Sequence, residues 1–258
     1  MNKPVHPYWG IAEIVIFTAL FFTGLWIAGP QIGSSPSLQL IFWVLVFLGG
    51  YYILWYSPKK LHYFTFRDLG FVLPSRKKRV QTSINKGWLS YSVFTIVGSI
   101  TLISYTAIFN QESLFQLQWN ALLIKFSGYL VYGTVQAVIF FGFMMPRIRQ
   151  VFPKTTHHKS NRRVQLSVVV ITAVIFSLYH IPNTQLMVCT LFAGLGWAWI
   201  YYYRPNILLM GLSHAILGTI LHQVVKLHMR IGPFYNNPDL YVIREVVPGL
   251  KKLIGDLF

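Results

Sequence analysis

Acidic residues are scarce in this chain. Its 258 residues include six Asp and Glu against 22 Lys and Arg, and charged residues of both signs make up only 11%. A soluble domain carries about 25% charged residues. The apolar residues, 54% of the total, come in runs of about twenty, the length that spans a bilayer. The shortage of charge therefore excludes an ordinary soluble domain and predicts an all-α, polytopic transmembrane helical bundle.

Cysteine is almost absent as well. Cys189 is the only one, so the chain can form neither an internal disulfide nor a Cys-based metal site. The first apolar run follows one lysine, Lys3, and lacks a small-residue cleavage site. It therefore predicts a retained helix rather than a signal peptide.

The apolar runs predict about seven membrane spans, or eight if the C-terminal tail re-enters the bilayer. We expect the whole chain to form a single membrane domain, with residues 226–258 as an interfacial or extramembrane tail that ends in an amphipathic helix at 240–258. The spans are expected at 9–28, 38–55, 88–109, 121–145, 164–181, 186–203 and 207–225.

The net charge of +16 is distributed unevenly. The N-terminus and the loops on its side of the membrane hold 16 of the 22 Lys and Arg, and the opposite loops hold none. Because cytoplasmic loops carry the excess of basic residues, this predicts a protein of the cell inner or plasma membrane with a cytoplasmic N-terminus. The basic loop from Arg147 to Arg163, with His157 and His158, should face water and anionic headgroups. The expected partner is the lipid bilayer, and nucleic acid is not expected.

No pair of carboxylates lies at membrane depth. Of the six acidic residues, only Glu13 falls in a span, about one helical turn from its cytoplasmic end. Aspartyl and di-metal sites both need paired carboxylates, so these two designs are excluded.

Histidines are the remaining candidates for chemistry. His180 and His214 lie in the fifth and seventh spans, and His222 follows His214 on the same helix face. Ionisable side chains at membrane depth usually face a bundle interior or a wet cavity. Each histidine could tie neighbouring helices together, the set could share one polar site, or it could bind a metal or a porphyrin. The residues alone leave the metal or pigment unknown.

Three stretches resemble motifs of the CPBP family, which includes the type II CAAX prenyl endopeptidases and the bacteriocin-processing or immunity proteins of the Abi group. The first motif reads E-E-x-x-F-R-G in the family, and residues 136–142 read Q-A-V-I-F-F-G. The second, F-x-x-x-H, is matched by Phe176 and His180. The third, H-x-x-x-N, is matched by His214, with Gly218 at the position of the Asn. The resemblance covers a CPBP-like core at about 60–225.

The resemblance implies that the first glutamate activates water and that the histidines and the Asn assist and hold the oxyanion. In this chain Gln136 and Ala137 replace both glutamates, Phe141 replaces the arginine, and Gly218 replaces the Asn. Glutamine cannot take the proton that a general base must accept. We therefore expect a pseudoprotease that acts as a binding or accessory and assembly subunit, with a membrane protein or a lipidated peptide as its partner.

Two other interpretations stay open. The chain could be an active intramembrane CAAX-type peptidase with a rearranged site that uses His180, His214 and either Glu13 or a metal. It could instead be a structural subunit of a larger membrane complex, with histidines that only pack or that ligate a pigment or metal. The two motif histidines and Gln136 are expected to meet in one pocket. Because His180 lies about 25 Å along its span, this span must start outside the hydrocarbon, tilt, or end in a dip into the bundle near 181–183. We favour the dip, since Pro and Asn can line a cavity there.

Overall fold

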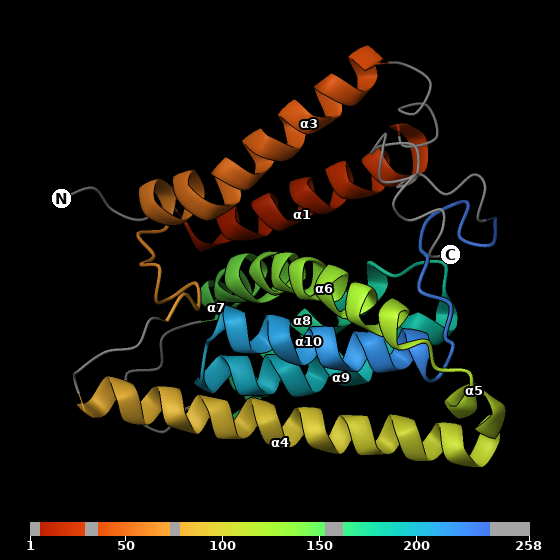
Figure 1. Cartoon of the computed structure of the whole chain (residues 1–258). Coiled ribbons are helices and arrows are strands. Elements are labelled where there is room, and N and C mark those ends of the chain that lie inside the picture. The colour runs from red at the N-terminus through yellow and green to blue at the C-terminus, as the bar shows by residue number, and fades with distance from the viewer. Residues whose placement is uncertain (1–5, 29–35, 73–77, 153–161, 238–258) are drawn as a thin grey trace. The chain divides into compact units, whose positions relative to one another are not determined.

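The structure is a computed structural model that describes residues 6–28, 36–72, 78–152 and 162–237 (Figure 1). In these ranges the chain forms helices joined by turns and contains no β-strand, which confirms the all-α prediction. The chain divides into two compact units, one of Met1–Tyr63, His180–Thr184 and Arg230–Phe258, the other of Phe64–Tyr179 and Gln185–Met229. A single membrane domain stays a prediction. His157, His158 and the predicted tail helix at 240–258 lie outside the described residues.

The first unit contains two long apolar helices. Pro7 occupies the first turn of the first one, where its missing N–H costs nothing because that group has no partner within a helix. Each helix continues without a break into a π-helical stretch, and the candidate membrane spans that cross these joins, Tyr8–Ala28 and Leu40–Leu61, have 21 and 22 residues. The segments are α1 (Pro7–Thr23), η1 (Gly24–Ala28), α3 (Pro36–Tyr51) and η2 (Tyr52–Leu61).

The second unit is built around the pairing of α6 and α10, with α4 also packed on α10 (Figure 1). Gly218 of α10 faces Tyr129 of α6, and Gly211 of α10 faces Thr134, so the two helices run antiparallel. The segments of this unit are α4 (Lys78–Phe109), α5 (Gln111–Phe115), α6 (Trp119–Gln136), η3 (Ala137–Met144), α7 (Met145–Val151), α8 (Arg162–Leu178), α9 (Thr184–Tyr203) and α10 (Ile207–Gln223).

A turn that precedes α4 holds the corner between α9 and α10. The hydroxyl of Tyr201 donates to the Leu69 carbonyl at 2.8 Å, and the amide of Ile207 donates to the Gly70 carbonyl at 2.9 Å. Gly70 has a φ of 81°, and a Cβ there would collide with the Tyr201 hydroxyl. Glycine is needed for both reasons, so this position fixes the start of the helix that carries His214.

Five helices are long and apolar enough to cross a membrane: Tyr8–Ala28, Leu40–Leu61, Asn85–Phe109, Trp119–Val151 and Thr184–Tyr203. The predicted fifth and seventh spans correspond to α8 and α10, which have 17 residues each. A polytopic helical bundle is thus confirmed, with five candidate spans where the sequence predicts about seven. The predicted orientation of the N-terminus stays a prediction.

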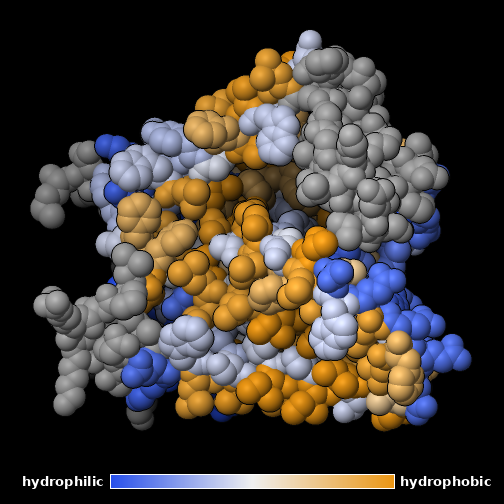
Figure 2. Space-filling view, in the orientation of Figure 1, coloured by the Kyte–Doolittle hydropathy of each residue, from blue (hydrophilic) through white to orange (hydrophobic). Residues whose placement is uncertain are grey.

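Large apolar side chains cover much of the visible surface (Figure 2). Phe47 of α3 is 77% exposed, and along α4 the exposed residues Val93, Val97 and Ile100 recur at helical spacing. Monomeric soluble proteins rarely expose apolar patches of this extent, whereas lipid tails accommodate them. The exposed faces therefore fit helices surrounded by a lipid bilayer.

Candidate functional site

The interface between α6 and α10 places His214 directly against a glycine. A Cβ at Gly133 would lie 2.5 Å from Nδ1 of His214 and 2.9 Å from its Cβ. Real side chains do not approach this closely, so only glycine at 133 leaves room for the imidazole. Small residues allow membrane helices to approach closely, and here the space that one glycine opens is filled by the ring of a motif histidine.

Three aromatic rings surround His214. Trp197 of α9 stacks on the imidazole, with the ring centroids 5.1 Å apart and the planes at 25°. Tyr129 and Tyr132 of α6 present their rings at centroid distances of 6.4 and 6.5 Å. Such contacts favour particular ring orientations. His214 is therefore a buried imidazole whose orientation is set by its neighbours.

The stacking partner of His214 is itself held in place. Nε1 of Trp197 donates to Oγ of Ser213 at 2.9 Å, and Oγ1 of Thr95 bonds the same oxygen at 2.7 Å. This chain of bonds joins α9, α10 and α4 next to the motif histidine. A site held by such supporting bonds is preorganised rather than shaped by its ligand.

His222 shares the face of α10 that carries His214, as the sequence predicts. The Tyr129 hydroxyl lies 2.9 Å from Nδ1 of His222, and the Tyr129 ring also contacts His214. Gly218 lies between the two histidines, and a Cβ there would approach the Tyr129 ring to 3.3 Å. A tyrosine ring therefore covers the position at which the family carries its Asn.

The two positions at which the family motif has glutamates are buried. Gln136 is 7% exposed and Ala137 only 1%, at the point where α6 passes into the π-helical η3. Such local widenings of a helix are frequent at functional sites. The Gln136 amide interacts with Tyr132 one turn earlier, whereas Oε1 of Gln136 has no hydrogen-bond partner among the described residues. A buried carbonyl without a partner lowers stability.

The position at which the family motif has an arginine lies in an aromatic core. Phe141 is 1% exposed, and its ring centroid lies 5.8 Å from both Phe176 and Tyr201. Phe140 packs on Phe176 at 5.0 Å. An arginine in these surroundings would need a buried partner for its charge. The absence of charge at 136, 137 and 141 is therefore consistent among the three positions, since no buried charge is left without a partner.

His180 lies outside the helix that was predicted to carry it. α8 ends at Leu178, so the predicted span through Ile181 is wrong. The physical reason is Pro182, whose ring would clash with the carbonyl four residues earlier, that of Leu178, and which has no N–H to donate. His180 occupies the turn that follows, and the backbone amide of Asn183 donates to its carbonyl at 3.0 Å.

This turn belongs to the first unit and is held by the segment after α10. The Asn183 side-chain amide donates to the Arg230 carbonyl at 3.2 Å, and the Gly232 amide donates to the Ile181 carbonyl at 3.0 Å. His180 and Asn183 are both buried. The meeting of His180 with Gln136 and His214 in one pocket stays a prediction.

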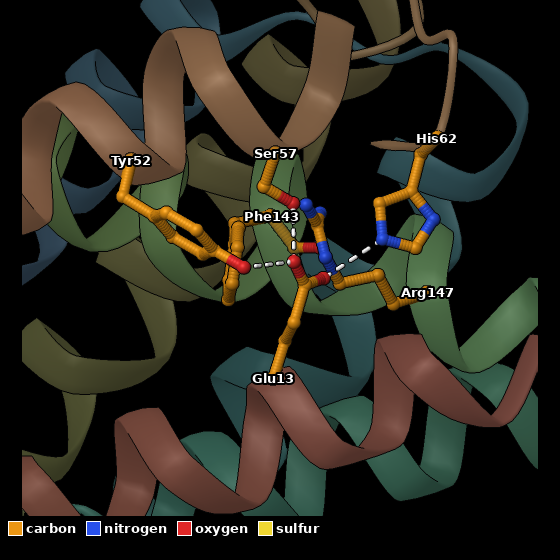
Figure 3. A network of polar contacts seen from close by, with 6 residues as sticks. All are labelled: Glu13, Tyr52, Ser57, His62, Phe143 and Arg147. Atoms are coloured by element: carbon orange, nitrogen blue, oxygen red, sulfur yellow. Dashed lines mark hydrogen bonds and ion pairs between the residues drawn. The ribbon is translucent and has the colours of Figure 1, made fainter. Parts of the chain in front are cut away.

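A second polar cluster in the first unit surrounds Glu13 (Figure 3). The Tyr52 hydroxyl donates to Oε1 of Glu13 at 2.6 Å, and Ser57 donates to the same oxygen at 2.5 Å. Nε2 of His62 lies 2.8 Å from Oε2. The sequence singles out Glu13 as a candidate base, but both of its oxygens are engaged in joining α1 to η2 and to His62, the residue that follows η2. These three partners could not be predicted from the sequence, since His62 lies 49 residues away and no spacing pattern connects them.

We expect Ser57→Ala to lower the free energy of unfolding by about 1–2 kcal/mol, because it removes one donor from a buried acceptor. Chemical unfolding of the protein in detergent micelles measures this change. The matched control is Ser90→Ala, since the Ser90 hydroxyl bonds only the Lys86 carbonyl of its own helix at an exposed site. Equal effects of the two substitutions would contradict a stabilising role for the Glu13 cluster.

The sequence predicts that Arg147 faces headgroups and water, but its position in the structure is different. Its side chain is fully buried, Nη1 donates to the Phe143 carbonyl at 2.6 Å, and the guanidinium lies 3.8 Å from the centroid of the Phe143 ring (Figure 3). A second ring, that of Phe64, lies 5.8 Å away. The expectation was wrong because Arg147 is still part of a helix, α7, and does not lie in the loop. Its guanidinium bonds the Phe143 carbonyl and contacts two aromatic rings, and these contacts replace those with water.

Metal ligands are not clustered in the part of the chain that the structure describes. There, no three His, Cys, Asp or Glu side chains are grouped as a metal site would need. A catalytic zinc ion, for example, takes three protein ligands. The chain offers no complete ligand set for a metal in these residues.

Comparison with known proteins adds one finding. Residues 118–220 match the family model described as type II CAAX prenyl endopeptidase Rce1-like. No curated protein matches the chain, and no solved structure matches it. The matched segment contains all three motif stretches, and five apolar helices accompany it. The resemblance to the CPBP family is thereby confirmed over residues 118–220, and the five apolar helices are those of an integral membrane protein.

Proposed function

We propose that this protein is a pseudoprotease: a CAAX-protease-like membrane protein that binds a lipidated peptide or a membrane-protein partner without cleaving it. The observation that carries the proposal is the joint replacement of the charged motif residues. Gln136, Ala137 and Phe141 are all buried, and the last packs into an aromatic core.

The chemistry of amide hydrolysis supports this proposal. A base must deprotonate the attacking water, and donors must stabilise the developing oxyanion. The carboxamide of Gln136 cannot accept the proton, and the loss of a general base costs about 10²–10⁴-fold in rate. Gly218 offers no side-chain donor where the family has an Asn. Glu13 is a poor substitute base because three donors already engage its carboxylate.

The packing around His214 supports a binding role. The imidazole stacks on Trp197, and Gly133 makes room for it. In a chain without the catalytic carboxylates, this ordered imidazole offers a bound partner a polar contact.

The proposed location is the cell inner or plasma membrane, with the N-terminus in the cytoplasm. The support is the concentration of Lys and Arg in one set of loops. Labelling of a Lys3→Cys variant in a Cys189→Ser background tests this. An impermeant maleimide should not react in intact cells, and reaction there would contradict the orientation.

A peptide-binding and cleavage assay tests the proposed function. The full-length protein in lipid nanodiscs is incubated with a farnesylated peptide and its unprenylated twin, and both bound and cleaved peptide are quantified by mass spectrometry. We expect the farnesylated peptide to bind and to stay intact, and we expect His214→Ala to weaken binding. His6→Ala is the matched control, because His6 is exposed at the start of α1, where its ring stacks on Tyr8 and accepts a hydrogen bond from the Tyr8 amide.

Two outcomes would favour the other interpretations. Cleavage that His214→Ala abolishes would support an active peptidase, as would a stoichiometric transition metal that is lost from the His180→Ala, His214→Ala double variant. Binding of neither peptide, together with a co-purifying pigment or subunit, would favour a structural role in a larger complex.

A further inference from the structure

Gln136 offers a hydrogen-bond acceptor that the described part of the chain does not use. Its side chain is more than nine-tenths buried, and Oε1 has no partner there. Gln136 follows Gly133 by three residues, so it lies on the same face of α6, one turn beyond the contact with His214. This acceptor therefore lies on the face of α6 that packs against the imidazole, about one helical turn away from that contact.

We propose that Oε1 of Gln136 accepts a hydrogen bond from a backbone N–H of the bound peptide, so that the site recognises a non-helical stretch of uncleaved polypeptide. This inference rests on the proposed function and adds to it the group that is recognised. In the family that this chain resembles, this position carries a carboxylate that activates water. In this chain the side chain at the same position would bind the peptide itself.

Because the Gln136 carboxamide is uncharged, the group that donates a hydrogen bond to it should be uncharged as well. A carboxylate would attract a cation, whereas an amide oxygen in apolar surroundings pairs well with an uncharged N–H or O–H. A peptide that leaves its helix at membrane depth exposes N–H groups that find no water. An acceptor on the wall of the site satisfies one of them. A lipid hydroxyl and a buried water are the other occupants that the experiment must separate.

An N-methyl scan provides the test. Each backbone amide of the farnesylated peptide is methylated in turn, which removes one donor at a time, and the Kd is measured with the full-length protein in nanodiscs. In the wild-type protein, methylation at one position should weaken binding about 3- to 10-fold. Gln136→Leu should weaken binding of the unmodified peptide by a similar factor. In that variant the sensitive methyl group should have no further effect, because the two losses concern one bond.

Gln165→Leu is the matched control. Gln165 is also buried, but its Oε1 is engaged by the Tyr203 hydroxyl at 2.5 Å, on α8 and α9. Its substitution should leave the peptide Kd unchanged. Gln136→Leu removes the buried acceptor together with the amide contact to Tyr132, so its free energy of unfolding is measured beside the Kd. Gln136→Met serves as a second variant of similar length.

The possible failures differ from one another. Wild-type affinity in Gln136→Leu, or additive losses from the substitution and the methyl group, would overturn the inference and leave the proposed function standing. These are the results expected if only a buried water or a lipid hydroxyl occupies the acceptor. Absence of peptide binding in the wild-type protein would overturn both the inference and the proposed function.

Discussion

Ala137→Glu should lower the free energy of unfolding by about 3–5 kcal/mol, the range seen when a buried charge has no partner. Ala137 is 1% exposed, and it occupies a position at which the family carries a glutamate. Phe141, four residues later, stands where the family has an arginine, and it packs on other aromatic rings. Restoring the carboxylate alone therefore buries a negative charge in an apolar core. We expect no peptidase activity from this variant.

Ala137→Gln separates the effect of charge from that of size. Both substitutions add a side chain of nearly the same volume, so their difference in unfolding free energy reports the carboxylate. This difference should be largest at pH 8 and should shrink at pH 5, because a carboxylate that takes up a proton is buried as a neutral group. Chemical unfolding in detergent at both pH values measures it. Equal stability of the two variants at pH 8 would show that the site accommodates a charge.

Gly133→Ala should destabilise the protein by about 3 kcal/mol, at the upper end of the range for overpacked cores. The added methyl group would lie 2.5 Å from Nδ1 of His214 and 2.9 Å from its Cβ. The Cβ cannot rotate away, so α6 and α10 must separate or the imidazole must leave its stack on Trp197. We expect binding of the farnesylated peptide to fall together with stability.

A double-mutant cycle isolates this contact. His214→Ala removes the ring that the new methyl group would meet, so Gly133→Ala should cost much less in that background than in the wild-type protein. Gly128→Ala is the control, since a Cβ at Gly128 meets nothing within 4 Å. It should be neutral or slightly stabilising because alanine favours helices over glycine. Additive effects of the substitutions at 133 and 214 would contradict the close contact.

The sequence predicts the helices well because their signal is local. Apolar runs of about twenty residues need no partner to be recognised, and a helix is present at each of the seven predicted places. The boundaries are less accurate where backbone chemistry intervenes. The sequence predicts that Pro182 stops the fifth span at Ile181, whereas α8 ends at Leu178, because the proline ring also excludes the last helical turn before it.

Contacts between distant segments are what the sequence does not reveal. The motif resemblance identifies Gln136 and His214, but nothing in the spacing indicates that Trp197 stacks on His214. Nor does the spacing indicate that Tyr52 and His62 engage Glu13. These contacts depend on helix rotation and crossing, which follow from packing of the whole unit.

The central claim is that this CAAX-protease-like site binds a peptide and does not hydrolyse it. The most direct measurement is incubation of the wild-type protein with an excess of farnesylated peptide in ¹⁸O-labelled water, followed by mass spectrometry. We expect peptide that binds and remains at its original mass. Fragments whose new carboxyl group carries ¹⁸O, formed over many turnovers and absent with His214→Ala, would contradict the account.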